Sequence, residues 1–253
     1  MSRFNLKNKV ILITGSSNRL DFTITRDLTQ KSTVMILNER DEVKLTNSVQ
    51  LLRNENLNVD GFAFNVSDSA EVKKSVLQIT EKYGTIDVLV NNAGIQIRGP
   101  LEDFTETDWN RILQINLSSA FIVSREIIKS MIERKSGKII NICSLQSDLA
   151  RPTIAPYSVS KAGLKMLTKV MATEWAKHNI QVNAIGPKYF KTEMTKALHE
   201  NKEFDSWLCN RTPANRWGNP EELLGALIFL ASEASSYING QIIYVDGGMT
   251  ACV

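Results

Sequence analysis

Short apolar runs rich in valine and isoleucine recur along this chain and alternate with longer stretches of helical pattern. Near-continuous apolarity is typical of strands that are covered on both faces, as in a parallel sheet. Helices between successive parallel strands give right-handed crossovers, so we predict a doubly wound α/β fold with a seven-stranded, mainly parallel sheet flanked by helices. The predicted strands are residues 9–14, 33–38, 59–65, 86–92, 138–143, 180–185 and 241–246.

The predicted helices fall between these strands, and two of them carry start signals. Thr105 with Asp108 three residues later fits a helix N-terminus, and Pro220 followed by two glutamates fits another. The predicted helices are residues 20–31, 41–56, 69–83, 105–133, 156–178 and 220–232.

A chain of 253 residues suits one large domain better than two small ones, and this chain has no internal repeat, linker or low-complexity segment. We therefore predict a single domain over residues 1–253. Residues 188–216 break the strand–helix alternation. An insertion near the carboxyl ends of parallel strands is well placed to be a substrate lid, and we predict that role for this segment.

Charge and cysteine usage exclude several classes of protein. The formal net charge is +3, acidic and basic residues are interspersed, and no basic tract points to nucleic acid. The three cysteines and two histidines have no metal-like spacing, so we predict reduced thiols and no metal site. The N-terminus lacks the long apolar region of a signal peptide, and no stretch reaches transmembrane length. We therefore predict a soluble cytoplasmic protein with no membrane contact.

Three polar residues fit an acid/base centre for an alcohol–carbonyl pair. Tyr157 and Lys161 stand four residues apart in YSVSK, so they share one face of a predicted helix. A phenol has a pKa of about 10, and a nearby cation such as Lys161 favours the phenolate and lowers that pKa. Ser144, at the end of the strand KIINIC, is placed to hydrogen-bond the substrate oxygen. Tyr157 would then transfer the proton while a cofactor transfers hydride. Taken alone the pair is weak evidence, since a solvated tyrosine–lysine pair on a helix is common.

The order of the motifs makes the pattern specific. NNAG (91–94), INL with Asn116, NICS with Ser144, YSVSK, IQVNAIGP and YVDGG follow one another along the chain. In these motifs the chain resembles the short-chain dehydrogenase/reductase family over essentially its whole length. Longer runs, among them NICSLQS, YFKTEMTKAL and TPANRWG, resemble the gluconate 5-dehydrogenase (5-keto-D-gluconate reductase) branch of that family.

The resemblance implies a Rossmann fold and an NAD(P)-dependent oxidoreductase that interconverts a hydroxyl and a ketone of a sugar acid. It also implies a catalytic tetrad of Asn116, Ser144, Tyr157 and Lys161, in which Asn116 helps to hold a water in a proton relay through Lys161. The alternative for Asn116 is a residue inside a helix that bonds local backbone, as asparagine readily does.

The loop after the first strand departs from the family pattern TGxxxGxG, because Arg19 and Asp21 occupy two glycine positions. Those glycines allow a tight turn, close approach of backbone to pyrophosphate and close helix packing. Two like charges about 4 Å apart cost roughly 4 kcal/mol at an effective dielectric of 20, so Asp21 would repel a diphosphate. Arg19 either offsets this by bonding phosphate or blocks the site, and Asp21 is alternatively a helix cap. Lys188 also stands where the family has glycine beside the nicotinamide. These substitutions support a second hypothesis, a family member with impaired or lost cofactor binding (a pseudoenzyme).

Other cofactor positions match the family. The stretch Asn38–Glu39–Arg40 leaves NAD and NADP both open, because an acid suits a free ribose 2′-hydroxyl and an arginine suits a 2′-phosphate. The resemblance implies the following cofactor-binding residues: Gly15, Ser17, Asn18, Arg19, Leu20, Asn38, Glu39, Arg40, Asn65, Val66, Asn92, Ala93, Gly94, Tyr157, Lys161, Pro187 and Thr192.

A sugar acid needs a cation for its carboxylate and polar groups for its hydroxyls. Arg98, Gln146 and Arg151 follow the motifs closely enough to face the substrate together with Ser144 and Tyr157. The alternative is that both arginines lie on exposed loops. The terminal run YVDGGMTACV resembles a family segment that is buried between subunits, so we predict a homotetramer, with a dimer as the alternative.

Overall fold

The apolar runs form the strands of one parallel sheet in the computed structural model, which describes residues 2–16, 26, 28, 33–192 and 195–252. Within these residues the sheet has seven strands in the order β3-β2-β1-β4-β5-β6-β7, and each neighbouring pair is parallel. The predicted fold class is confirmed. The strands are β1 (Val10–Ile13), β2 (Val34–Glu39), β3 (Val59–Ala63), β4 (Val88–Asn91), β5 (Gly137–Ile142), β6 (Ile180–Pro187) and β7 (Ile242–Val245).

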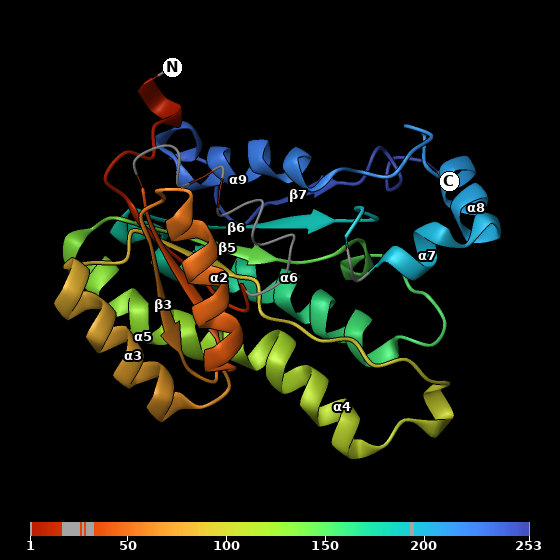
Figure 1. Cartoon of the computed structure of the whole chain (residues 1–253), viewed down its shortest axis with the longest axis horizontal. Helices are drawn as coiled ribbons and strands as arrows, with labels where there is room; N and C mark the ends of the chain where they lie inside the picture. The colour runs from red at the N-terminus through yellow and green to blue at the C-terminus, as the bar shows by residue number, and fades with distance from the viewer. Residues whose placement is uncertain (1, 17–25, 27, 29–32, 193–194, 253) are drawn as a thin grey trace.

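Helices cover both faces of the sheet because successive strand residues point in opposite directions. In β1, Val10 and Leu12 join the core beneath α3, α5 and α6, whereas Ile11 and Ile13 join the core beneath α2 and α9. Figure 1 shows α9 on one side of β5 and β6 and α6 on the other. The bounds of these helices are α2 (Glu42–Asn54), α3 (Ser69–Tyr83), α5 (Ser119–Arg134), α6 (Ala155–Trp175) and α9 (Leu224–Ala231).

Side-chain caps set the helix starts. Asp41 accepts hydrogen bonds from two backbone N–H groups at the start of α2, and Asp68 does the same for α3. Thr105 caps α4 (Glu106–Leu113) by accepting from the Asp108 N–H, as its sequence position predicted. Asn219 forms a capping box with Glu222 at the turn η7 (Pro220–Leu223) that precedes α9.

The predicted helix at 105–133 is one continuous helical segment with a π turn inside it. The turn η3 (Gln114–Ser118) separates α4 from α5 and contains Asn116. Such turns insert one extra residue into the helix and occur often at functional sites. Of the predicted helix at 20–31 only Arg26 and Leu28 are described, and both are helical.

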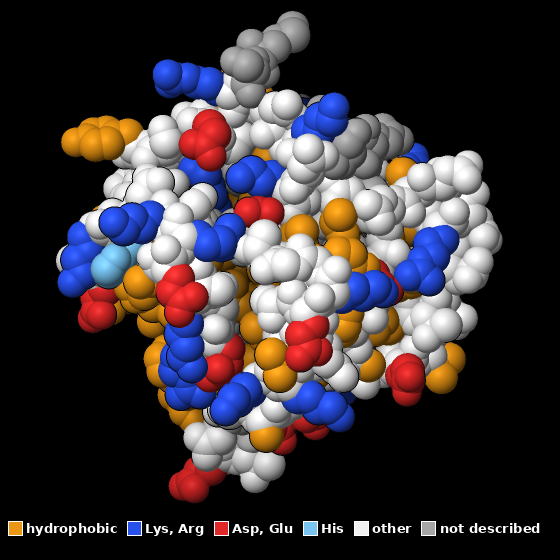
Figure 2. Space-filling model, turned by 90° about the vertical axis from the view of Figure 1, so that its left-hand side faces the viewer, with side chains coloured by type: hydrophobic (Ala, Val, Ile, Leu, Met, Phe, Trp, Pro, Cys, Tyr) orange, Lys and Arg blue, Asp and Glu red, His pale blue; other side chains and the backbone are white. Residues whose placement is uncertain are grey.

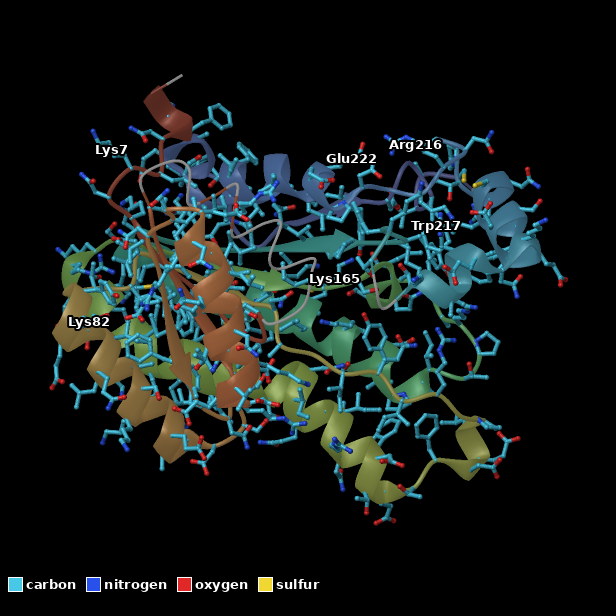
Figure 3. The ribbon with its side chains drawn as sticks, in the orientation of Figure 1. Lys7, Lys82, Lys165, Arg216, Trp217 and Glu222 are labelled. Carbon is cyan, nitrogen blue, oxygen red and sulfur yellow. The ribbon has the colours of Figure 1, made fainter. Side chains whose placement is uncertain are left out.

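The insertion at 188–216 contains α7 (Lys196–Glu200) and α8 (Lys202–Arg211), which lie at the end of the molecule near the C-terminus (Figure 1). Its aromatic rings pack together: the Tyr189 ring lies 5.9 Å from that of Phe204 and 5.7 Å from that of Trp217. Trp217 lies near the ion pair of Arg216 and Glu222, all three labelled in Figure 3. The remaining short turns are η1 (Ser2–Phe4), η2 (Leu101–Asp103), η4 (Leu145–Ser147), η5 (Ala176–His178) and η8 (Glu233–Ser235).

Acidic and basic side chains are mixed on the face shown in Figure 2, with no large area of one sign. Among the helices of the described residues, none has the length and apolarity needed to cross a lipid bilayer. All three cysteines are free, and Cys143 is buried.

Candidate active site

The carboxyl ends of β1, β4, β5 and β6 meet at one edge of the sheet. The strand order reverses between β1 and β4, and ligands of doubly wound folds bind in the crevice at such a point. A cavity of about 340 Å³ opens at the ends of β1, β2 and β4. We call it the nucleotide cleft. Residues that line it include Gly15, Asn38, Glu39, Arg40, Lys44, Asn65, Val66, Ala93 and Gly94.

Tyr157 and Lys161 both face this edge from the first turns of α6. The Lys161 ammonium lies 5.8 Å from the centroid of the Tyr157 ring and donates a 2.6 Å hydrogen bond to the carbonyl of Ile142, the last residue of β5. The helix begins with Pro156 in its first turn, where the missing N–H of proline costs no helical hydrogen bond. Lys161 is therefore buried and fixed to the sheet, whereas Tyr157 beside it is half-buried.

Burial dominates the protonation of this pair. It raises the pKa of Tyr157, while a hydrogen bond between the Ser144 and Tyr157 side chains acts in the opposite direction. Burial also lowers the pKa of Lys161. The net direction for Tyr157 is therefore upward and not the expected fall, because desolvation of the phenolate is the largest effect. Tyr157 is a protonated phenol at neutral pH.

Ser144 follows β5 and opens the turn η4. Its hydroxyl donates to Gln146 Oε1 at 2.9 Å and accepts from the Gln146 N–H at 3.3 Å. Ser147 completes a capping box with Ser144 and donates to the carbonyl of Lys161 at 2.9 Å. The turn is thus tied to α6, which fixes Ser144 beside Tyr157. Ser147 was not among the predicted residues, because the capping-box sequence signature has glutamate or glutamine at that position.

Asn116 is buried in the π turn and bonds the segment that follows β4. Its side-chain oxygen accepts from the Ile95 N–H at 2.8 Å, and its amide donates to the Ile95 carbonyl at 2.9 Å and to Ser160 Oγ at 3.1 Å. It therefore does not bond backbone of its own helix. A Cβ built on Gly94 would lie 3.4 Å from Asn116 Oδ1 and 3.8 Å from Lys161 Nζ. The structure thus brings together all four residues of the predicted tetrad.

The start of the nucleotide cleft is clamped by Thr14 and Asn92. The Thr14 hydroxyl accepts from the N–H groups of Asn92 and Ala93, and the Asn92 amide donates to the carbonyls of Thr14 and Gly15, each at 3.1 Å. Gly15 has φ +64°, and a Cβ there would come within 2.6 Å of the Ala93 Cα. Only glycine fits this position. At Gly15 the chain after β1 therefore packs closely against the segment that follows β4.

Five other predicted cofactor residues lie at the ends of β2 and β3 and line the nucleotide cleft. Asn38 is buried and braces the cleft, since its side chain accepts from the Gly15 N–H and donates to the Phe64 carbonyl. Asn65 is exposed at the cleft and Val66 is buried there. Glu39 and Arg40 line the cleft at the end of β2.

The positions predicted beside the nicotinamide lie after β6. Pro187 ends β6, and the Thr192 hydroxyl lies 3.1 Å from that of Thr195. The predicted residues Ser17, Asn18, Arg19, Leu20 and the substituted Asp21 lie outside the described residues.

The substrate side contains an unforeseen contact. Lys188 Nζ donates a 2.8 Å hydrogen bond to Gln146 Oε1, the same oxygen that accepts from Ser144. Arg151 donates to the Tyr189 hydroxyl at 2.9 Å, and a backbone bond from Gly99 to Thr153 joins the segments that carry Arg98 and Arg151. Arg151 is half-buried and Arg98 is exposed. From the sequence, Lys188 was only a lost glycine, whereas in the structure its ammonium shares the Gln146 Oε1 acceptor with the Ser144 hydroxyl.

Known proteins match this chain over nearly its whole length. Residues 22–250 match the family model described as Enoyl-(Acyl carrier protein) reductase. The 5-keto-D-gluconate 5-reductase of Escherichia coli (strain K12) is 48% identical over 250 residues, which cover 99% of this chain and 98% of that protein. This chain is a short-chain dehydrogenase/reductase.

Two further relatives place this short-chain dehydrogenase/reductase among gluconate 5-dehydrogenase-like enzymes. The gluconate 5-dehydrogenase of Gluconobacter oxydans (strain 621H) is 45% identical over 247 residues, covering 98% of this chain and 96% of its own. A gluconate 5-dehydrogenase from Burkholderia cenocepacia J2315, solved in complex with NADP and tartrate, superposes with a TM-score of 0.95 at 45% identity, covering 99% and 98% of the two chains.

Proposed function

We propose that this enzyme interconverts 5-keto-D-gluconate and D-gluconate, or a closely similar pair of sugar acids, with NADP as the cofactor. The observation that carries the proposal is the convergence of Asn116, Ser144, Tyr157 and Lys161 at the edge of the nucleotide cleft. Arg98 and Arg151 act electrostatically on Lys188, which bonds the same Gln146 oxygen as Ser144, and arginine suits a carboxylate.

The nucleotide cleft supports a dinucleotide at the described positions. Gly15 and Gly94 both line the cleft, and at Gly15 a Cβ would come within 2.6 Å of the Ala93 Cα. Arg40 follows β2 and Lys44 lies in the first turn of α2, and both line the cleft beside Glu39. Two cations there suit a ribose 2′-phosphate, which supports NADP. When bound, the cofactor supplies or accepts the hydride at the reacting carbon.

The side chains of this chain handle the proton and the oxygen. The Ser144 hydroxyl hydrogen-bonds the substrate oxygen and holds it beside the Tyr157 hydroxyl. Because burial raises the pKa of Tyr157, the phenol is protonated at neutral pH and is ready to donate its proton to that oxygen during ketone reduction. Lys161 and Asn116 lie near Tyr157 and are bonded to the backbone of Ile142 and Ile95. They would hold the water through which a proton returns to Tyr157.

A cofactor titration tests the proposal directly. Calorimetry with NADPH and NADH should give binding, tighter for NADPH, and NADPH oxidation should depend on added 5-keto-D-gluconate. If neither cofactor binds at millimolar concentration, the proposal fails. That outcome would favour the second candidate, a family member that has lost cofactor binding, which rests on Arg19 and Asp21 in the glycine loop.

We also propose that the enzyme is a homotetramer. Val159, Met166 and Val170 are exposed on one side of α6, and all four residues of the edge strand β7 are partly exposed. These apolar surfaces and the terminal run YVDGGMTACV support packing against further copies of the chain. Light scattering after size-exclusion chromatography should give four times the 28.4 kDa monomer mass.

A further inference from the structure

Three cations gather beside Ser144 on the substrate side of the site. Arg98, Arg151 and Lys188 act on one another electrostatically, and we call them the cation cluster. Within the described residues none of the three forms an ion pair with a carboxylate. Arg151 instead bonds the Tyr189 hydroxyl, and Lys188 bonds the neutral amide of Gln146. Like charges held together without a counterion destabilise one another, which an anionic ligand would relieve.

We propose that Lys188 binds the carboxylate of the substrate and makes this site selective for acids over neutral sugars and polyols. The proposal rests on the proposed function for the reaction itself, but it concerns a residue at a position where relatives of the family have glycine. Lys188 Nζ and Ser144 Oγ donate to the same oxygen of Gln146, so the ammonium lies within two hydrogen-bond lengths of the serine that holds the reacting oxygen. The anion would therefore sit on the reacting side of the substrate pocket.

The nearby carboxylates are already engaged. Lys188 also borders a pocket that presents Glu222 and Asp246. Glu222 is paired twice with Arg216, at 2.6 and 2.7 Å. Asp246 accepts from the backbone of Gly248 and from Thr250. The cation cluster thus remains available for a carboxylate that comes from outside the described chain.

The surroundings of Lys188 also link ligand binding to pH. Burial, with Arg151 and Arg98 nearby, lowers the pKa of Lys188 to about 7. The ammonium also lies 4.1 Å from the centroid of the Tyr189 ring, whose hydroxyl bonds Arg151. An anion bound at Lys188 favours its charged form. Affinity for the anion should consequently fall as the pH rises through the pKa of the free lysine, whereas the carboxylate of gluconate stays ionised throughout.

The test is the binding of D-gluconate, measured by calorimetry against D-glucitol, which has a hydroxymethyl group in place of the carboxylate. Lys188→Met should weaken gluconate binding about 10- to 100-fold and leave glucitol binding unchanged. Lys188→Arg should keep gluconate binding but remove its decline between pH 6 and 9. Lys191→Met removes an exposed lysine three residues away and serves as the matched control. Thermal melting of each variant checks that it is folded.

The outcomes separate this proposal from the proposed function. Gluconate binding that depends on Lys188 supports it even if no NADPH is oxidised, because the assay needs no turnover. Equal binding of gluconate by the Lys188→Met variant and the unaltered enzyme, or no binding by either, overturns it. It is also overturned if Lys188→Gly tightens NADPH binding without weakening gluconate, since Lys188 would then be an obstacle at the nicotinamide site.

Discussion

The proton-transfer side of the cleft and its nucleotide side are built in the same way but differ in how far the family pattern persists. On the first side, Lys161 and Asn116 are tied to the backbone of Ile142 and Ile95, and every residue of the tetrad is present. On the second side, the Asn92 amide bonds the Thr14 carbonyl and fixes the start of the loop after β1. Further along this loop, however, Arg19 and Asp21 replace two glycines of the family pattern. The difference implies that proton transfer and cofactor affinity can change independently in this enzyme.

The largest effect is expected on the proton-transfer side. Tyr157→Phe should lower kcat by about 10²- to 10⁴-fold, because the substrate oxygen loses its proton donor. NADPH affinity should change far less than kcat, because Tyr157 is one of many residues predicted to bind the cofactor. Steady-state reduction of 5-keto-D-gluconate and NADPH calorimetry measure the two quantities. Unchanged turnover would remove the assignment of Tyr157 as acid.

A reversion tests the nucleotide side. Arg19→Gly combined with Asp21→Gly should tighten NADPH binding by up to about 10³-fold, because relief of roughly 4 kcal/mol of charge repulsion corresponds to that factor. Calorimetry gives the dissociation constants. Asp21→Asn is the matched control that removes only the charge. If the double variant binds no better than the unaltered enzyme, the loop is not what limits affinity.

Gly15, at the nucleotide side of the cleft, should not tolerate replacement by a residue with a side chain. Gly15→Ala places a methyl group 2.6 Å from the Ala93 Cα at a positive φ, so we expect a loss of more than about 1 kcal/mol in the free energy of unfolding. NADPH binding should weaken as well. Urea denaturation and calorimetry measure the two effects, and Gly225→Ala is the control because a Cβ there meets no atom within 4 Å. Equal stability of both variants would contradict the tight fit.

Asn116→Ala tests whether proton transfer depends on the hydrogen bonds between the Asn116 side chain and the backbone of Ile95. The substitution leaves the Ile95 N–H and carbonyl without their partners, so we expect a loss of about 1–3 kcal/mol in the free energy of unfolding. Turnover should fall further than stability alone explains if Asn116 also holds the relay water. Comparison of kcat at temperatures where both proteins are folded separates the two contributions. An unchanged kcat would leave Asn116 with a structural role only.

The smallest effect is expected away from both sides, at the exposed pair of Arg216 and Glu222 (Figure 3). Hydrogen bonds from Arg216 and the Asn219 N–H lower the pKa of Glu222 to about 2. A depressed carboxyl pKa stabilises the fold above the unfolded value of about 4.3, and this contribution is lost as the pH falls toward 2. Because the pair is solvent-screened, Glu222→Gln should cost less than about 1 kcal/mol at pH 7. The melting temperatures of the unaltered enzyme and the Glu222→Gln variant should become equal near pH 2. A difference in melting temperature that stays constant with pH would show that it does not come from this ion pair.

The fold was predictable because the spacing of apolar residues along the chain indicates which side chains are buried. All seven predicted strands are present, and Thr105 caps its helix as expected. The π turn at Asn116 was not predictable, since one extra residue in a helix leaves the apolar pattern nearly unchanged. The tetrad was predictable from its residue types and order, because the chemistry requires them.

The sequence by itself determined the parallel sheet and the family and predicted the four residues of the tetrad, since these follow from local pattern and motif order. Only the tertiary structure decided the protonation of Tyr157, because burial depends on what α6 packs against. It also decided the contacts of Lys188. From the sequence this residue is a missing glycine, whereas in the fold its side chain shares an oxygen with Ser144 through Gln146, 42 residues away in the chain. Contacts between distant segments are set by the packing of strand ends, which no local pattern encodes.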